Sequence, residues 1–237
     1  MNFERTIFYF LGILFFLITN SCQKIKKDLN INKSIPPNFL AIQPFGNVSK
    51  EEVLAVKKSI LQYYELQIKV LPNISLPKNC NNTAVGEFLK TKLALRYRAD
   101  SLLIFLKKNK PKGIQYILGI TNEDITCTNR DKNGQITYPS WMHSDWGIFG
   151  LGYCPGSACI ISSFRLKFDN PIPKKLHERL SRVARHEIGH NFGLPHCTQK
   201  KLNCFMAQVN LQNALLSLDT ESDSLCSLCK KQVKYAR

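Results

Sequence analysis

The hydrophobic and polar positions of this chain follow two different periods, and each period predicts one kind of element. Residues 49–65 carry apolar side chains at helical spacing, and Ser49 is placed to cap the helix that they predict. Short apolar runs bounded by Gly, Pro or Asn predict five strands. These strands are expected at 39–46, 66–74, 113–125, 146–154 and 157–168.

Two further helices complete the expected fold. One is predicted over 89–109, with an interruption near Arg98 to Asp100, and the other over 174–192. Between the third and fourth strands, residues 128–145 form a loop, with a hairpin turn at Asn133 and Gly134. The order β-α-β-α-β-β-β-α predicts an α+β domain: a mixed, twisted sheet covered by helices, ending in a helix and a cysteine-rich C-terminal part.

The N-terminus predicts export. Residues 1–21 contain an apolar run of signal-peptide length, shorter than a membrane span, and the run ends just before Cys22. This start resembles a bacterial lipoprotein signal, which implies a lipid on Cys22, a tether over 22–38 and a membrane-anchored protein on the periplasmic or outer face of the cell envelope. Cleavage at a nearby bond and an uncleaved anchor are the alternatives, with Cys22 incidental in both. A folded domain is then expected over 39–237.

The charge of the chain is strongly positive, +16 at pH 7. Such a charge favours anionic surfaces, including lipid headgroups, acidic polysaccharide and nucleic acid. The lysines are scattered, and no aromatic RNA-binding signature or finger spacing accompanies them, so no specific nucleic-acid site is predicted. A nucleic-acid binder would also leave the histidine cluster described next without a role. We expect a monomer.

The stretch "HEIGHNFGLPHC" predicts a metal site within the region 174–229. His186 and His190 stand one helical turn apart on one face and can hold one ion. Glu187 lies about 100° round the helix, near enough to act on a water at the ion. Gly193 ends the helix, and His196 returns to the ion as a third ligand.

Chance is a poor explanation for this pattern. Its five fixed letters have a probability on the order of 10⁻⁵ in a chain of this composition. Three imidazoles leave a fourth position open, as in catalytic zinc sites, and Glu187 would act as general base and then general acid. His143 and His177 stand alone in the sequence and are interpreted as ordinary side chains.

Cysteines follow the histidines in two groups. Cys197 and Cys204 precede a Cys-x-x-Cys pair, Cys226 and Cys229, and four thiolates can close a structural zinc site. A redox pair or two disulfides are the alternatives. A second set, consisting of Cys80, Cys127, Cys154 and Cys159, is expected either to form two bridges or to remain as free thiols.

Together with "CFM" and "CSLC", this stretch resembles the archaemetzincins, a branch of the metzincin metallopeptidases. The resemblance implies a zincin-like fold, a catalytic zinc on the three histidines, a second zinc on the four cysteines, and Met206 as the turn methionine beneath the catalytic metal. The intervals before Cys204 and before Cys226 are longer than is usual in the family. "YILGIT" and "WGIFGLG" are also similar to the core and substrate-edge strands of the family.

The sequence therefore predicts a zinc-dependent peptidase with two Zn²⁺ ions per chain and a peptide or protein substrate. The glycine-rich edge, Gly150, Leu151 and Gly152, is expected to hold a peptide backbone as an added strand. The alternative is a zinc-binding adaptor or storage lipoprotein with a vestigial peptidase site. Glu187 argues against the alternative, because metal storage needs no carboxylate at that position.

Overall fold

The computed structural model describes residues 38–82, 95–198, 204–208, 214–220 and 223–233. The predicted signal peptide, Cys22 and all but the last residue of the tether lie outside these residues. Across the described ranges, none of the helices has the length and apolar character that a membrane span requires.

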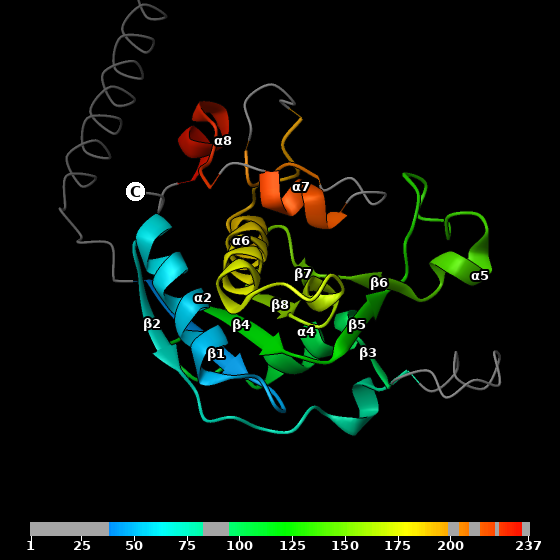
Figure 1. Ribbon diagram of the computed structural model, residues 1–237, viewed down its shortest axis with the longest axis horizontal. Coiled ribbons are helices and arrows are strands. Elements are labelled where there is room, and N and C mark those ends of the chain that lie inside the picture. Colours follow the sequence, from blue (N-terminus) through cyan, green and yellow to red (C-terminus); the bar gives the residue numbers. More distant parts are fainter. Residues whose placement is uncertain (1–37, 83–94, 199–203, 209–213, 221–222, 234–237) are drawn as a thin grey trace, which may run out of the picture. The chain divides into compact units, whose positions relative to one another are not determined.

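A five-stranded sheet forms the centre of the domain (Figure 1). Its spatial order is β2-β1-β4-β8-β7, and all neighbours are parallel except β7, which is antiparallel to β8 at one edge. The strands are β1 (Asn38–Pro44), β2 (Leu66–Val70), β4 (Tyr116–Thr121), β8 (Ala158–Ser162) and β7 (Gly150–Gly152). The sheet is thus mixed, as predicted.

Both faces of this sheet are buried, which explains why its inner strands read as continuous apolar runs. Side chains that point to one face, such as Ile42 and Leu118, pack against α2 (Lys50–Tyr63) and α6 (Pro173–Asn191). Their neighbours in sequence, such as Ala41 and Ile117, point to the other face and pack around α4 (Ala99–Lys108). The period of two along each strand therefore builds two cores on opposite sides.

The predicted helix starts and stops are confirmed for the two helices on the first face. The Ser49 side chain accepts from the Glu52 amide, and the Glu52 carboxylate accepts from the Ser49 amide, which is a complete capping box. Helix α6 begins with Pro173 and ends at Asn191, within one residue of the predicted bounds. The last elements are two short helices, α7 (Ala214–Thr220) and α8 (Ser227–Gln232).

The helix predicted over 89–109 is wrong for residues 95–98, whereas the interruption predicted near Arg98 to Asp100 is confirmed as the point where the helix begins. Residues Arg96–Arg98 form strand β3, and the helix begins at Ala99. Strand β3 pairs with β5 (Asp124–Cys127), where the Arg96 guanidinium bonds the Asp124 carboxylate at 2.9 Å. This pairing is distant in sequence, so local helical spacing could not reveal it.

Four predicted strands are too long, the first of them 66–74, which ends at Val70 as β2. Residues 113–125 divide into β4 and β5, and residues 146–154 divide into β6 (Trp146–Ile148) and β7. In both cases the two parts belong to different sheets, because β3, β5 and β6 form a separate three-stranded sheet. The run 157–168 is a strand only to Ser162 and then a 3-10 turn at Arg165–Lys167. Apolar character continues through each division because both sheets contribute to buried cores.

The loop between β5 and β6 contains the expected turn and one short helix, α5 (Ser140–His143). Gly134 adopts a positive φ of 78° and its amide donates to the Asp131 carbonyl, which closes the predicted hairpin turn. An additional 3-10 turn lies at Lys78–Cys80.

Candidate active site

Helix α6 holds the centre of the site because one of its faces is anchored in the core. Leu180, Val183, Ala184 and Ile188 are buried on that face, as their spacing predicted. At its C-terminal end the Gly193 amide donates to the His190 carbonyl, and the Leu194 amide donates to the Gly189 carbonyl. Gly193 has φ 88°, so the helix ends in a Schellman turn that redirects the chain toward His196.

The three predicted histidines converge. One ring nitrogen from each of His186, His190 and His196 lies within 4.8 Å of the others. Nδ1 of His186 lies 2.7 Å from the carbonyl oxygen of Phe205, and Nδ1 of His190 lies 2.7 Å from that of Leu194. Because a carbonyl can only accept, both Nδ1 atoms carry the proton, which leaves the Nε2 lone pairs free to bind a metal.

The protonation state of the rings suits zinc. Burial lowers the pKa of His186 to about 3, and the neighbouring imidazole of His190 adds to the effect. Burial also lowers the pKa of His190 and of His196. At neutral pH the three rings are therefore neutral, as a set of imidazole ligands must be, and they leave one position of a tetrahedral zinc ion open.

Glu187 lies beside the histidines in a space created by two glycines. The residue is 7% exposed, and burial raises the pKa of its carboxyl to about 8. A Cβ atom at Gly150 would lie 2.8 Å from the Glu187 carboxylate, and one at Gly152 would lie 2.8 Å from the Glu187 carbonyl oxygen. Both glycines are on β7, so the edge strand predicted to hold substrate also leaves room for the acidic side chain.

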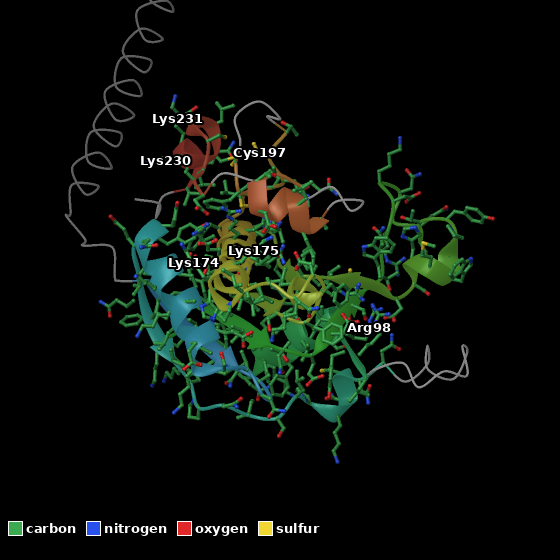
Figure 2. The ribbon with its side chains drawn as sticks, in the orientation of Figure 1. Arg98, Lys174, Lys175, Cys197, Lys230 and Lys231 are labelled. Atoms are coloured by element: carbon green, nitrogen blue, oxygen red, sulfur yellow. The ribbon has the colours of Figure 1, made fainter. Side chains whose placement is uncertain are left out.

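The four predicted cysteines also form one cluster. The Sγ atoms of Cys197, Cys204, Cys226 and Cys229 lie within 4.8 Å of one another, and those of Cys197 and Cys226 are 3.8 Å apart. This separation is far beyond an S–S bond, and it matches the distance of about 3.8 Å between two ligands of a tetrahedral zinc with bonds of about 2.3 Å. In Figure 2, Cys197 lies close to α8, the helix that carries Cys229.

The short segment 204–206 connects the two clusters. The Phe205 carbonyl is the hydrogen-bond partner of His186, while the Met206 carbonyl accepts from the Cys197 amide at 2.7 Å. Met206 is fully buried, and its sulfur fills the space beside Gly189, one residue before His190. This segment therefore supports His186 through the Phe205 carbonyl and Cys197 through the Met206 carbonyl.

A cavity of about 720 Å³ opens at His186, His196 and Glu187. Its walls are mainly apolar and come from β6, β7, α6, the segment 204–208 and α7. The apolar residues that line it include Trp146, Ile148, Phe149, Phe168, Val183, Phe205, Leu215, Leu216 and Leu218. Two guanidinium groups, those of Arg165 and Arg182, also face the cavity.

Three arginines on α6 belong to the site's support and were not identified from the sequence. Arg179 is 1% exposed and bonds the carboxylates of Asp169 and Asp219 at 2.6 to 2.7 Å. Arg182 and Arg185 both bond Asp223. The spacing of three arginines at i, i+3 and i+6, with two aspartates four apart near the C-terminus, is the signal that could have predicted this pairing. These ion pairs hold α7, through Asp219, and the chain just before Cys226, through Asp223, against α6.

The remaining candidates have ordinary roles or are free. His143 stacks on Trp146, with ring centroids 4.7 Å apart, and neither His143 nor His177 joins a group of possible metal ligands in the described ranges. The second set of cysteines contains free thiols rather than bridges. Of these, Cys80 and Cys159 are buried, Cys127 is half-buried and Cys154 is exposed.

A helix carrying two histidines, a third histidine after a glycine turn and a glutamate at an apolar cavity define the class of zinc-dependent metallopeptidases. Comparison with known families agrees with this class. The model of peptidase family M54 matches residues 39–235. The chain belongs to this family, the archaemetzincins, and is therefore a hydrolase.

Individual relatives cover most of the chain. The archaemetzincin of Haloarcula marismortui is 33% identical over 199 residues, which span 81% of this chain and 97% of that protein. The archaemetzincin of Methanocaldococcus jannaschii is 28% identical over 82% of this chain and 92% of its own length. Among solved structures, the archaemetzincin of Methanopyrus kandleri has a TM-score of 0.60 and 26% identity, covering 82% of this chain and 92% of that one. A structure from Archaeoglobus fulgidus, complexed with malonate, has the same TM-score at 25% identity, covering 82% and 99%. The predicted fold class is confirmed.

Proposed function

We propose that the chain hydrolyses peptide bonds at the histidine cluster, with Glu187 as general base and then general acid. The observation that carries this proposal is the convergence of three neutral imidazoles beside a buried carboxyl at the mouth of an apolar cavity. A zinc ion held by His186, His190 and His196 would polarise the scissile carbonyl and make the attacking water more acidic.

The residues of the chain would then move protons and hold the reactants in place. Burial raises the pKa of Glu187, but a cation held by the three histidines would lower it again, so that the ionised carboxylate would take a proton from the attacking water and deliver it to the leaving amine. The carbonyls of Phe205 and Leu194 would keep two imidazoles in one tautomer and orientation throughout. The apolar cavity walls would exclude bulk water and so strengthen these interactions.

The peptide itself would lie along β7. This strand is at the edge of the five-stranded sheet, with β8 on its other side, so its outer backbone groups are available for an added strand. The neighbouring cavity would receive one large apolar side chain of the peptide, because most of its lining side chains are apolar.

The four-cysteine cluster would hold the second zinc ion as a structural ion. All four ligands come from the protein, so no position is open for substrate. Its role would be to fix the segment that carries His196 and the turn that supports His186.

The location proposed for the enzyme rests on the N-terminal sequence. Residues 1–21 would direct export, and a lipid on Cys22 would anchor the protein to a membrane of the cell envelope, with residues 23–38 as tether. Labelling with a radioactive fatty acid tests this proposal, and label that survives Cys22→Ser would contradict it.

The peptidase proposal is tested by digestion of a mixed peptide library with the full chain in detergent, read by mass spectrometry. Glu187→Gln should abolish cleavage while both zinc ions remain bound, because glutamine keeps the shape but loses the proton acceptor. Glu178→Gln, on the exposed side of the same helix, is the matched control and should cleave normally. If the wild-type chain carries two zinc ions and cleaves nothing, the zinc-binding adaptor becomes the better description.

A further inference from the structure

The loop between β5 and β6 presents a group of large apolar side chains to solvent. Tyr138 is 91% exposed, Trp141 71%, Met142 43% and Ile136 39%. Elsewhere in the described ranges such residues stand singly, as Leu54 and Ile104 do, or at most in pairs four positions apart, as Phe168 and Ile172 do. Single exposed apolar residues are normal on protein surfaces, whereas a cluster within seven positions marks a contact site. In Figure 1 this loop and α5 stand at the end of β6, beside the two sheets.

The exposure of these side chains is built into the loop. The Asp131 carboxylate accepts from the amides of Asn133 and Gln135 at 2.9 Å, and the amide of Asn129 donates to the His143 carbonyl at 2.8 Å. The His143 ring stacks on Trp146 of β6. Polar groups and one histidine thus close the base of the loop, while the apolar side chains remain outside. A contact made by such a preformed loop requires little further ordering of the backbone.

The charges around this cluster indicate an anionic partner. Arg130 and Lys132 are exposed in the same loop, where one exposed acid, Asp131, is engaged by the turn. The other acid, Asp145, is 8% exposed and ion-paired with Arg96. The chain as a whole carries a charge of +16. Basic residues next to exposed Trp and Tyr match an anionic lipid surface, where aromatic rings lie at the headgroup level and cations contact phosphate.

We infer that this loop is a membrane-contact surface whose occupant is an anionic lipid bilayer. Trp141, Tyr138, Met142 and Ile136 enter the boundary between headgroups and acyl chains, and the two basic residues lie among the headgroups. Such a loop adds a contact with the membrane that does not require the lipid proposed on Cys22. The inference goes beyond the proposed peptidase function and does not depend on the chemistry of Glu187.

The contact has a consequence for the substrate. Strand β6 begins at Trp146, which lines the active-site cavity and stacks on the histidine of the loop. A loop docked on the bilayer therefore places the cavity near the membrane surface. The substrates that reach it most readily are peptides and chain segments close to that surface.

Trp141 itself provides the test, because the chain has two tryptophans and the other is Trp146. Two variants of the full chain, Trp146→Phe and Trp141→Phe, each retain one tryptophan. Each variant is bound to vesicles of phosphatidylcholine and phosphatidylglycerol whose acyl chains are brominated. The fraction of each variant bound to vesicles is measured by sedimentation, and emission is compared at equal amounts of bound protein, so that it reports on the loop and not on attachment. We expect Trp141 emission to shift to the blue and to fall by about half or more, since its ring would reach the brominated region, whereas Trp146 emission stays nearly unchanged.

Second variants keep the result interpretable. Tyr138→Ser with Ile136→Ser, in the Trp146→Phe chain, should reduce the quenching of Trp141, whereas Leu54→Ser with Ile104→Ser should not. Vesicles without phosphatidylglycerol should quench less. If Trp141 emission is the same in solution and in vesicles that hold the chain, the inference is overturned. Protection of Trp141 by an added protein, without any protection by vesicles, would also overturn it and assign the loop to a protein partner.

Discussion

Gly189 tests whether Met206 holds the site in shape. An alanine Cβ at this position would lie 2.4 Å from the Met206 sulfur, 3.2 Å from its methyl group and 3.4 Å from the Tyr64 hydroxyl. The methionine is fully buried and cannot move outward freely. Gly189→Ala should therefore displace the 204–206 segment, whose carbonyls support His186 and Cys197.

The magnitude follows from two opposing effects. Overpacking a core position costs about 1–3 kcal/mol, while replacing glycine by alanine within a helix gains about 1 kcal/mol. The free energy of unfolding should fall by about 0–2 kcal/mol, so the variant remains folded. Zinc affinity at the histidine site should fall by about 10- to 100-fold, the usual effect of disturbing the groups that orient metal ligands.

The assay is competition with a chelator for zinc, combined with denaturant unfolding of the same samples. Met206→Ala removes the overlapping sulfur, so Gly189→Ala should cost less zinc affinity in a Met206→Ala background than in the wild type. Glu178→Ala is the control for a substitution elsewhere on the helix. Wild-type zinc affinity in Gly189→Ala would refute the reasoning that Met206 transmits support to the histidines.

Three further predictions concern the surroundings of the site. Hydrogen bonds from Arg179 are the main cause that lowers the pKa of Asp169, to about 2, and the pKa of Asp219. The resulting stabilisation is full above the unfolded pKa of about 4 and is lost as the pH falls toward 2. Arg179→Met should therefore reduce the pH dependence of the free energy of unfolding between about pH 4 and pH 2, measured by circular dichroism. Cys226→Ser should lower bound zinc from two ions to one and weaken zinc at the histidines by about tenfold; full activity with unchanged metal content would contradict the structural role. Asn191→Ala removes two hydrogen bonds, at 3.0 and 2.9 Å, to the carbonyls of Tyr153, just after β7, and of Ala158, the first residue of β8. It should cost about 2 kcal/mol or more in denaturant unfolding, and a loss under about 0.5 kcal/mol would show that water replaces the amide.

Local signals predicted the parts of this fold that local physics determines. The capping box at Ser49, the length of α6 and the glycine turn at Gly193 each depend on residues within a few positions, and each is confirmed. The convergence of the histidines was predictable for the same reason, since His186 and His190 are one turn apart and His196 follows the turn directly.

Pairings between distant segments were not predictable in this way. Strand β3 exists because Arg96 lies opposite Asp124, and the division between β6 and β7 exists because the chain passes from one sheet to the other at Phe149. Locally, Arg96–Arg98 does not differ from the start of the helix that follows it, and residues 146–152 do not differ from one continuous strand. Gly150 shows how far a function can be inferred from sequence alone. The absence of a side chain was interpreted as space for substrate, whereas the structure shows that it also leaves space for Glu187, 37 positions away.

The two clusters depend on the same short piece of chain, which explains why they follow each other in the sequence. His196 and Cys197 are adjacent in the chain, so a displacement of either cluster is transmitted directly to the other. On the opposite side, Phe205 and Met206 are also adjacent and bond to His186 and Cys197 respectively. Two neighbouring pairs therefore close a ring between α6 and the cysteine cluster. A zinc ion in that cluster would fix both pairs at once, so the cysteines would contribute to catalysis by positioning the histidines, without touching substrate.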